Sequence, residues 1–559
     1  MVRRNTAPIQ YIDTADALMA DMRGWSGDWD WLRQHIMPRT QSGADREERP
    51  SASARRVHST VAIKSLRILT GAHIMYITPS NQRWFSFQSG LRGKKKLSRV
   101  DEWFAESTEI TFTELSRSNF YTEIHETFLD RCLTGTGCLF CDTLPDGRLN
   151  FRHIPSGTYA IAEGANGQVD TLVRIFKLSP HQAVSKFGYK NLPEKIREAW
   201  DNPKRRYTDK QEYLHLVLPR LSYDFGHDLI NSKRMKWASV YMTANGERHV
   251  IREEGYPEFP YLVTRFLRYG EGPYGYAPGL DVMEEILATL KLERVMDVLG
   301  EVAAFPRILQ LAEQVGEIDL RAGGITTVKP NAAAAKLPRE WATSGSYDVG
   351  KDRILDKEQK IREAFFVDML MPLATIDRQM TATEINARQE ERVLSFSPSL
   401  TLFISDCNVL MHRIFSILFR LGKFPQDDVP AELIVPDLGG SENFELELPN
   451  VQYLGRISQA IANAQQQGLE YFMQVALNYT QATGDTSMIE YVNPRKFAQF
   501  LYERTGAPTS CRRTARELAE LDKQKERDAE MQRKLAATQG LKNAAGAQKD
   551  LAAAGAGAI

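Results

Sequence analysis

The chain has 559 residues, 42% apolar and 25% charged, so it is long enough for several domains and can bury a core without disulfides. Its formal net charge is zero, which argues against a protein that grips nucleic acid over a broad basic surface. The five cysteines are scattered and no run of about 18 apolar residues occurs, so we expect free thiols, a reducing compartment and no membrane span.

Positive charge gathers at the beginning of the chain. Residues 1–100 carry 17 Lys and Arg against 8 Asp and Glu, a net charge of +9. The densest basic run, RGKKKLSR at residues 92–99, is typical of a solvated loop, and a contact for nucleic acid or an acidic partner is the alternative. Any contact with nucleic acid is therefore expected at a few positions only.

Helical periodicity dominates the first 134 residues. The sequence WSGDWDWLRQHIMP has apolar residues at helical spacing and ends at Pro38, which predicts a helix over residues 25–38. Further helices are expected over residues 57–69 and 106–134, and a polar loop precedes the first of these.

Between residues 135 and 270 short alternating runs are separated by turn pairs. The pairs are Asp-Gly at 146–147, Asn-Gly at 166–167 and Asn-Gly at 245–246. Each pair predicts a hairpin, because type I′ turns need positive φ at both central residues. This region is therefore expected to be mostly β, with one inserted helix near Pro180–Phe187.

Two apolar helices are expected next, over residues 278–303 and 351–370. The first begins near Pro278 in APGLDVMEEILATLKLERVMDVLGEV, and the second follows from DRILDKEQKIREAFFVDML. Residues 305–350 between them break into β-like and Gly-, Ala- and Pro-rich pieces. Both helices have broad apolar faces, which predicts burial against neighbouring subunits as well as within one.

A long helix is expected over residues 381–421. Thr381 and Glu384 form a capping box at its start. Pro398 lies in its interior, where a proline removes one hydrogen bond and clashes with the preceding turn, so a kink or a break is expected. Short β-like pieces at 433–435 and 444–448, helical segments, and an Ala- and Gly-rich tail follow.

The stretch GSYDVGKD at residues 345–352 has the glycine and lysine spacing of a phosphate-binding loop. That mechanism also requires a buried strand before the loop and a Ser or Thr hydroxyl for magnesium. Here the polar KLPREWATS precedes it, and Asp352 occupies the hydroxyl position. We therefore expect Gly345, Ser346 and Gly350 to form a loop, with Asp352 in the first turn of the following helix.

Other patterns with catalytic or metal-binding potential are incomplete. HETFL at residues 125–129 begins like a zinc-protease helix, but Leu129 stands where the second His should be. Cys138 and Cys141 have a metal-like spacing, yet positions i and i+3 of a strand face opposite sides, so buried free thiols are expected. We expect no catalytic residue, cofactor or metal, which favours a binding or architectural protein.

The order of motifs resembles the portal, or head-to-tail connector, proteins of short-tailed double-stranded DNA bacteriophages. The motifs are the helix at 25–38, SNQRWF at 80–85, GPYGYAPGLD at 272–281, GGITTVKP at 323–330, MTATEINARQEE at 380–391 and ERTGAP at 503–508. Each motif alone is weak, whereas their order and spacing extend over most of the chain. The sequence departs from the pattern after residue 510.

The resemblance implies an α+β fold in which subunits assemble as a ring, usually of twelve copies. Each portal-type subunit has a β-rich wing, paired stem helices, a small α/β clip, a long kinked helix and a helical C-terminal crown. The implied parts are a wing at 1–270, the first stem helix at 271–304, a clip at 305–350, the second stem helix at 351–370, a tunnel loop at 371–381, the long kinked helix at 382–425, a C-terminal wing or crown region at 426–510, and a partly disordered tail at 511–559.

The implied function is a ring at one capsid vertex of the virion. Such a ring is the channel for DNA packaging and ejection and the docking site for the packaging motor and the tail. The implied partners are further copies of the chain, double-stranded DNA, the terminase motor, major capsid and scaffolding proteins, and tail adaptor proteins, without a membrane. Assembly is expected in the host cytoplasm.

The resemblance also points to site residues. Arg378 and Gln379 in the implied tunnel loop, and Arg388 on the next helix, are expected to touch DNA. Glu384 lies one turn from Arg388 and offers it an ordinary ion pair, and intersubunit bonds are the alternative for all three. The residues expected at the ring interface are Ile286, Leu287, Leu290, Leu299, Ile361, Phe365 and Phe366. A near-neutral chain suits a channel, because a ring repeats every phosphate contact.

Two alternatives belong to other classes. One is a different architectural protein of the virion, an adaptor or a scaffold, but adaptors are generally smaller and scaffolds are highly charged and helical. The other is the packaging ATPase, which requires an intact phosphate loop and an acidic residue at the end of a strand. The sequence has neither feature, which favours the portal interpretation.

Overall fold

The computed structural model describes most of the first 300 residues and parts of the remainder. The described ranges are 6–37, 59–90, 98–220, 235–245, 248–268, 270, 272–304, 308–309, 339–340, 347–370, 382–425, 429–430, 433–436, 444–454 and 471–481, with scattered positions from 492 to 534. The chain divides into two units, Met1–Gly90 with Glu106–Ile461 and Leu91–Ala105 with Ala462–Ile559. The first unit contains both larger sheets and the helices that pack on them.

Four helices precede the sheets. They are α1 (Thr6–Ile36), α2 (Val61–Ile77), α3 (Ser98–Arg117) and α4 (Phe120–Thr134). The sequence predicts α1 only from residue 25, but Ala15, Met19 and Met22 also pack into the main core and extend it. Two helices replace the single one expected over residues 106–134, and α4 ends at Gly135, whose φ is +85°.

Two antiparallel sheets occupy the region in which the turn pairs predict β structure. One has the order β3-β2-β9 and the other β4-β5-β6-β7-β8. Their strands are β2 (Thr136–Thr143), β3 (Leu149–Ile154), β4 (Tyr159–Glu163), β5 (Val169–Leu178), β6 (Gln211–Pro219), β7 (Trp237–Thr243), β8 (Val250–Tyr256) and β9 (Tyr261–Arg265). Gly147 and Gly167 adopt positive φ in the β2–β3 and β4–β5 turns, and the strands on either side pair, which confirms these two hairpins. Asp146 and Asn166 do not adopt positive φ, so the expected type I′ turn is wrong at both places.

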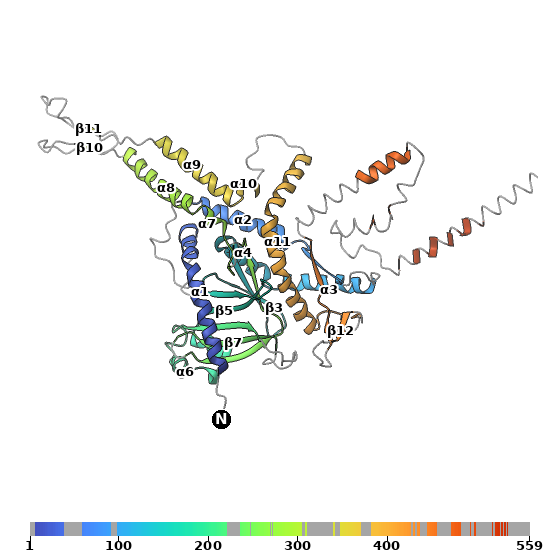
Figure 1. Cartoon of the computed structure of the whole chain (residues 1–559), viewed down its shortest axis with the longest axis horizontal. Helices are drawn as coiled ribbons and strands as arrows, with labels where there is room; N and C mark the ends of the chain where they lie inside the picture. The colour runs from blue at the N-terminus through green and yellow to red at the C-terminus, as the bar shows by residue number, and fades with distance from the viewer. Residues whose placement is uncertain are drawn as a thin grey trace, which may run out of the picture. The chain divides into compact units, whose positions relative to one another are not determined.

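Helices cover the five-stranded sheet. Neighbouring residues of a strand face opposite sides, so Tyr213 and Leu214 of β6 belong to different clusters. On the Leu214 side α1 packs on β4 and β5 (Figure 1). On the Tyr213 side lie α5 (Pro180–Phe187), which matches the expected inserted helix, and α6 (Glu194–Asp201). A capping box of Ser179 and Gln182 fixes the start of α5.

A helical hairpin follows the sheets. A short helix, α7 (Pro278–Asp281), leads into α8 (Met283–Ala304), and α9 (Tyr347–Ala364) packs beside α8 (Figure 1). Two short paired strands, β10 (Ile308–Leu309) and β11 (Arg339–Glu340), lie at the far end of the hairpin. The two helices confirm the pair that the apolar periodicity predicts.

The second helix of the hairpin differs from the prediction at both ends. Gly350 is inside α9 rather than in a loop, because a Cβ at this position would collide with Met296 of α8 and glycine lets the two helices approach. Lys351 and Asp352 are exposed on the same helix, while residues 345–346 lie outside the described ranges. At the other end Phe366 adopts φ 58° and separates α9 from α10 (Val367–Leu370).

The long helix α11 spans Ala382–Arg420 and continues through Pro398, so the helix does not break there, and a kink stays a prediction. Its second half packs against β9 and buries mostly apolar side chains. They include Phe403, Cys407, Leu410, Met411, Ile414, Phe415 and Leu418. Contrary to the expectation from sequence, Thr401–Arg420 is long and apolar enough to cross a membrane, but half of it is buried inside the protein. Core packing therefore accounts for its composition.

The last strands return to the beginning of the chain. The two β-like pieces predicted near residues 433 and 444 form β12 (Ile434–Pro436) and β13 (Phe444–Leu446), which pair with each other. β14 (Asn450–Tyr453) pairs with β1 (Phe85–Gln88), a contact that local sequence patterns do not predict. Cys132, Cys138, Cys141 and Cys407 are buried free thiols, as expected for the pair in β2.

Candidate functional site

The loop before α7 joins the helical hairpin to the sheets. Its GPYGYAPG sequence places the ring of Tyr274 against Trp25 and Trp29, with ring centres 5.5 and 5.0 Å apart. The Gly275 N–H donates to Thr136 Oγ1 over 2.8 Å, and its backbone lies directly against that of Gly135. Each of these glycines has no room for a side chain, so the motif has a structural explanation as a close crossing of two backbone segments.

The base of the hairpin is apolar and closed. Ile286, Ile361 and Phe365 are at most 2% exposed, and Gly279 of α7 lies against Leu32, Ile36 and Phe365. These three predicted interface residues are therefore buried within a single copy of the chain. They have no free surface for a neighbouring subunit, and their burial instead holds α8 and α9 to α7 and the N-terminal helices.

The other predicted interface residues are only partly covered. Leu287, Leu290, Leu299 and Phe366 have intermediate exposure, and Leu290 lines a small cleft between the hairpin base and the N-terminal helices. These four residues can still contact another subunit, so their assignment to the ring interface stays a prediction.

More exposed apolar side chains lie further along the hairpin. Val295 and Val298 of α8 are 53% and 49% exposed, and Val349 and Leu355 of α9 are 56% and 52% exposed. Sequence reasoning did not single them out, because a broad apolar face does not show which side chains the partner helix covers. Apolar side chains gathered on one exposed element indicate a contact surface.

Charged contacts contribute little to the hairpin. Lys357 of α9 lies 3.6 Å from Glu285 of α8, and the ion pair between Arg362 and Glu358 stays within α9. Such partly exposed pairs are worth about 0–1 kcal/mol. Apolar packing therefore holds the two helices together.

The residues expected to touch DNA lie largely outside the described part of the chain. Arg378 and Gln379 precede α11 in an undescribed stretch, and Arg388 is described only as a backbone position of α11. A contact of these residues with DNA stays a prediction, as does the alternative pairing of Arg388 with Glu384.

A buried arginine anchors α11 immediately after Pro398. Arg131 of α4 donates from Nη2 to the Ser399 carbonyl over 2.5 Å and to the Arg265 carbonyl over 2.9 Å. Its guanidinium also lies between the rings of Phe266 and Phe403, 5.6 and 5.7 Å from their centres. Burial lowers the pKa of Arg131 to about 10, so it remains charged at neutral pH. Sequence patterns gave no signal for this residue, which lies in an ordinary helix.

Glu258 anchors the other end of the same helix. Its carboxylate lies 2.5 Å from Arg420 and 3.4 Å from Arg413, and Arg413 also donates to the Cys141 carbonyl over 3.0 Å. The second half of α11 is thus tied to α4, β2 and the loop before β9. Arg388 lies on the other side of Pro398 from all of these bonds.

Replacing Arg131 with Met is expected to lower the free energy of unfolding by about 2 kcal/mol, the range for hydrogen bonds to a charged group. Met fills a similar volume but leaves the Ser399 and Arg265 carbonyls without this donor. Urea unfolding followed by circular dichroism measures the effect. Arg117→Met, at a side chain that is 71% exposed, is the matched control and should change stability by under about 0.5 kcal/mol.

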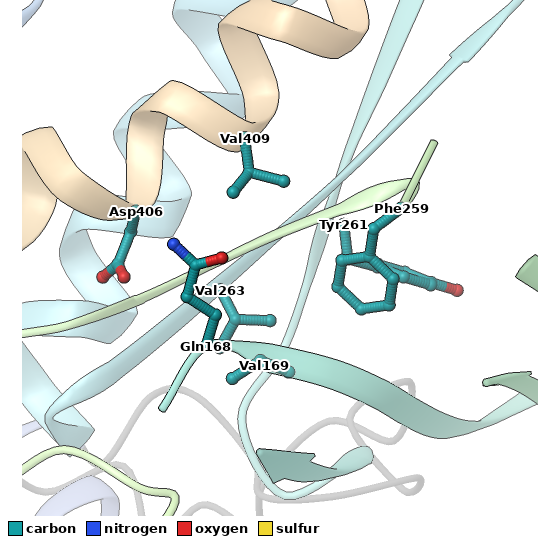
Figure 2. Close-up of a pocket in the computed structure, with 7 residues that line it drawn as sticks. All are labelled: Gln168, Val169, Phe259, Tyr261, Val263, Asp406 and Val409. Atoms are coloured by element: carbon teal, nitrogen blue, oxygen red, sulfur yellow. The ribbon is translucent and has the colours of Figure 1, made fainter. Parts of the chain in front are cut away.

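A small cleft lies where α11 crosses β9 (Figure 2). Val169, Val263 and Val409 line it together with Phe259 and Tyr261, and Asp406 and Gln168 provide its polar groups. Asp406 Oδ1 is 3.8 Å from Arg265, whereas Oδ2 has no hydrogen-bond partner within the described ranges. Burial raises the pKa of Asp406, against the opposing charges of Arg265 and Arg131. The space is of the order of one water molecule, so the cleft suits a bound water rather than a substrate.

Metal-binding groups do not converge in the part of the chain that the structure describes. No three His, Cys, Asp or Glu side chains there are placed to share an ion. The candidate contact surface is therefore the set of exposed apolar side chains on the helical hairpin, Val295, Val298, Val349 and Leu355.

Comparison with known proteins gives a consistent picture. A model of the family "Bacteriophage head to tail connecting protein" matches residues 10–512. A probable portal protein of Bordetella phage BPP-1 is 23% identical over 453 residues, which cover 80% of this chain and 79% of that protein. The portal protein of Salmonella phage epsilon15 is 25% identical over 366 residues, or 64% of this chain and 65% of that protein. One solved structure, the neck of an empty GTA particle, covers 73% of this chain at 12% identity with a TM-score of 0.36.

Proposed function

The chain belongs to the family of bacteriophage head to tail connecting proteins, and from this premise we propose how its copies assemble and pass DNA. Its function is that of a phage portal at the capsid vertex. This role is architectural, and the proposal concerns which surfaces of the subunit carry it out. Copies of the chain form a ring, twelve in number, with double-stranded DNA in the central channel.

The proposed parts of the subunit follow the described elements. The two sheets and their helices form the wing within residues 1–270, and the helical hairpin supplies the two stem helices. The clip at 305–350 then lies between the stem helices, and the tunnel loop at 371–381 precedes α11. The region from 426 to 510 forms the C-terminal wing or crown.

The exposed apolar surface of the hairpin is the observation that carries the ring proposal. Val295, Val298, Val349 and Leu355 are each about half exposed in one copy, although the hairpin base is closed. A neighbouring hairpin in a ring covers such side chains, and rotational symmetry repeats the same pair of complementary patches at every interface. Leu287, Leu290 and Phe366 lie nearer the base, and Leu299 follows Val298 along α8. These four residues extend the proposed interface.

The charge of the chain supports a channel that DNA slides through. Each neutralised phosphate strengthens a salt-dependent grip, and a ring multiplies every contact by its copy number. A chain with zero net charge limits that grip. Arg378, Gln379 and Arg388 are the proposed contacts, since the tunnel loop and the start of α11 are the segments that face DNA in this arrangement.

The proposed partners follow from the position of the ring. The clip faces the terminase motor during packaging and the tail adaptor proteins afterwards, and the wing faces the major capsid and scaffolding proteins. Assembly takes place in the host cytoplasm before the ring becomes part of the virion.

Electron microscopy of the purified full chain in negative stain, with mass photometry of the same sample, tests the proposal. We expect rings with a central hole wide enough for duplex DNA and a mass near twelve times 63.4 kDa. A monomer that no change of salt or protein concentration assembles would contradict it. An ATPase assay on the same sample should show no turnover, whereas hydrolysis would favour the packaging enzyme.

A further inference from the structure

A group of cations lies on the Tyr213 side of the five-stranded sheet, beneath α5. Its central member is Arg174 of β5, which is only 4% exposed and lies opposite His215 of β6. The guanidinium carbon is 4.7 Å from the centre of the Phe176 ring and 5.6 Å from that of Phe140. Within the described part of the chain its Nε has no hydrogen-bond partner and no carboxylate pairs with it. A buried cation without an ion-pair partner is unfavourable unless an anion binds beside it.

A second cation approaches the same ring from α5. Lys186 Nζ lies 5.1 Å from the centre of Phe176 and 4.6 Å from that of Tyr241. Lys186 lies on the exposed surface of α5, but its ammonium group packs against the faces of these two aromatic rings. Burial, together with the charges of Arg174, Arg152 and Arg252, lowers the pKa of Lys186 to about 7. Two like charges thus share one aromatic ring.

The surrounding charges leave this place positive. Arg252 of β8 is paired with Glu254, so it contributes little to the imbalance. Arg152 of β3 is exposed and has no ion pair with a described residue, and Asp142 of β2 is the acid whose charge favours protonated Lys186. Arg152, Arg174 and the protonated form of Lys186 therefore face one carboxylate. We call this group, Arg152, Arg174 and Lys186 with the Phe176 and Tyr241 rings, the cationic recess.

The positive charge also acts on a neighbouring histidine. The ring of His215 is stacked on that of Tyr241, with centres 4.1 Å apart. Burial lowers the pKa of His215, and the charges of Arg174 and Lys186 lower it further. His215 therefore stays neutral and adds no charge of its own. The positive charges of Arg174 and Lys186 act on it from the same face of the sheet.

We propose that the cationic recess binds a carboxylate-bearing segment of a partner protein, an acidic peptide whose Asp or Glu side chain lies between Arg174 and Lys186. A planar guanidinium accepts a carboxylate in two-pronged geometry, and a lysine ammonium adds a point charge. The aromatic rings give the aliphatic part of such a side chain an apolar surface. The recess is separate from the helical hairpin, so this inference does not depend on ring formation.

An acidic peptide fits the recess better than DNA does. Binding to a nucleic-acid backbone uses rows of protruding Lys and Arg side chains that follow successive phosphates. Here the central cation is buried in the face of a sheet, under a helix, and only one or two negative groups can reach it. A single carboxylate on a flexible chain satisfies that geometry.

Fluorescence anisotropy of a labelled hexaglutamate peptide with the full-length chain tests the proposal. We expect saturable binding that weakens at least tenfold in Arg174→Met and in Lys186→Met. Lys190→Met, at an exposed lysine that follows α5, is the matched control and should bind as the unaltered chain does. If Arg174→Met does not fold, Lys186→Met still decides the question, because this side chain lies on the surface of α5.

Thermal unfolding gives a second readout, because a residue with only a structural role would leave the peptide-dependent rise in melting temperature unchanged. The pKa of Lys186 in the folded chain is below its unfolded value, so the unfolded state binds more protons between about pH 7 and pH 10. The contribution of Lys186 to stability therefore rises with pH over this range. Lys186→Met should raise the melting temperature near pH 7, with a gain that shrinks toward pH 10. The peptide should raise the melting temperature of the unaltered chain but not of this variant.

Three outcomes would overturn the proposal. Equal peptide binding by the unaltered chain and both Met variants would place the peptide elsewhere. Displacement of the peptide by an equal concentration of inorganic phosphate would show a site for small anions rather than for a peptide segment. Displacement by short duplex DNA that depends on Arg174 would favour a nucleic-acid contact.

Discussion

Val295→Asp combined with Val298→Asp is expected to abolish ring formation while leaving a folded, soluble subunit. Both side chains are about half exposed in one copy, so Asp is tolerated there in the isolated chain. In the proposed ring the same positions become buried, and an unpaired buried carboxylate costs several kcal/mol. Every interface of the ring carries both charges, so the penalty repeats with each subunit. Mass photometry should show only monomers, with an unchanged circular dichroism spectrum.

A matched control separates loss of the interface from general loss of apolar surface. Leu144, in the β2–β3 turn, is 38% exposed and lies outside the hairpin, so Leu144→Asp should leave rings intact. Phe365→Asp is not a useful test of assembly, because Phe365 is fully buried and the change would unfold the hairpin base. Rings formed by the double Val variant would show that the proposed interface is misplaced.

Gly275→Ala is expected to lower the free energy of unfolding by about 3 kcal/mol, the upper range for an added group in a packed interior. A Cβ at this position would overlap the carbonyl group of Gly135 and lie 3.0 Å from Cβ of Arg265. The first obstacle is backbone, which cannot rotate away as a side chain can. Gly135 itself has a positive φ, so the crossing cannot easily shift to the other segment.

Gly300→Ala is the control for this substitution. Gly300 lies inside α8 with open space around its Cα, and alanine is the better helix former by about 1 kcal/mol. The control should therefore be neutral or stabilising in the same urea titration. Equal stability of the two variants would mean that the backbone crossing at Gly275 is looser than the structure indicates.

Local patterns predicted the elements that short-range chemistry determines. The Asp-Gly and Asn-Gly pairs marked two hairpins because Gly147 and Gly167 must take positive φ. Pro180 marked the start of α5, where the Ser179–Gln182 capping box fixes it. The apolar periodicity of the segments that form α8 and α9 likewise reflected a helical pair. In each case the signal and its structural cause lie within a few residues.

Tertiary contacts decided what the sequence could not show. Gly350 resembles a loop residue by itself, and only the approach of Met296 explains it inside α9. The periodic apolar face of α8 contained both buried Ile286 and exposed Val298, and only the packing of the neighbouring elements distinguishes them. Arg131 had no distinguishing pattern, because its role comes from Ser399, which lies 268 residues further along the chain.

The pairing of β1 with β14 cannot form until almost the whole chain has been synthesised. Their side chains Gln88 and Gln452 meet across 364 residues of chain. At a synthesis rate of about 5–20 residues per second, roughly 20–70 s pass on the ribosome before β1 can find its partner. During that interval Phe85 and Phe87 belong to a strand without its partner, and an unpaired strand edge can pair with other chains. A growing chain that stalls before residue 450 is therefore the species most prone to aggregate.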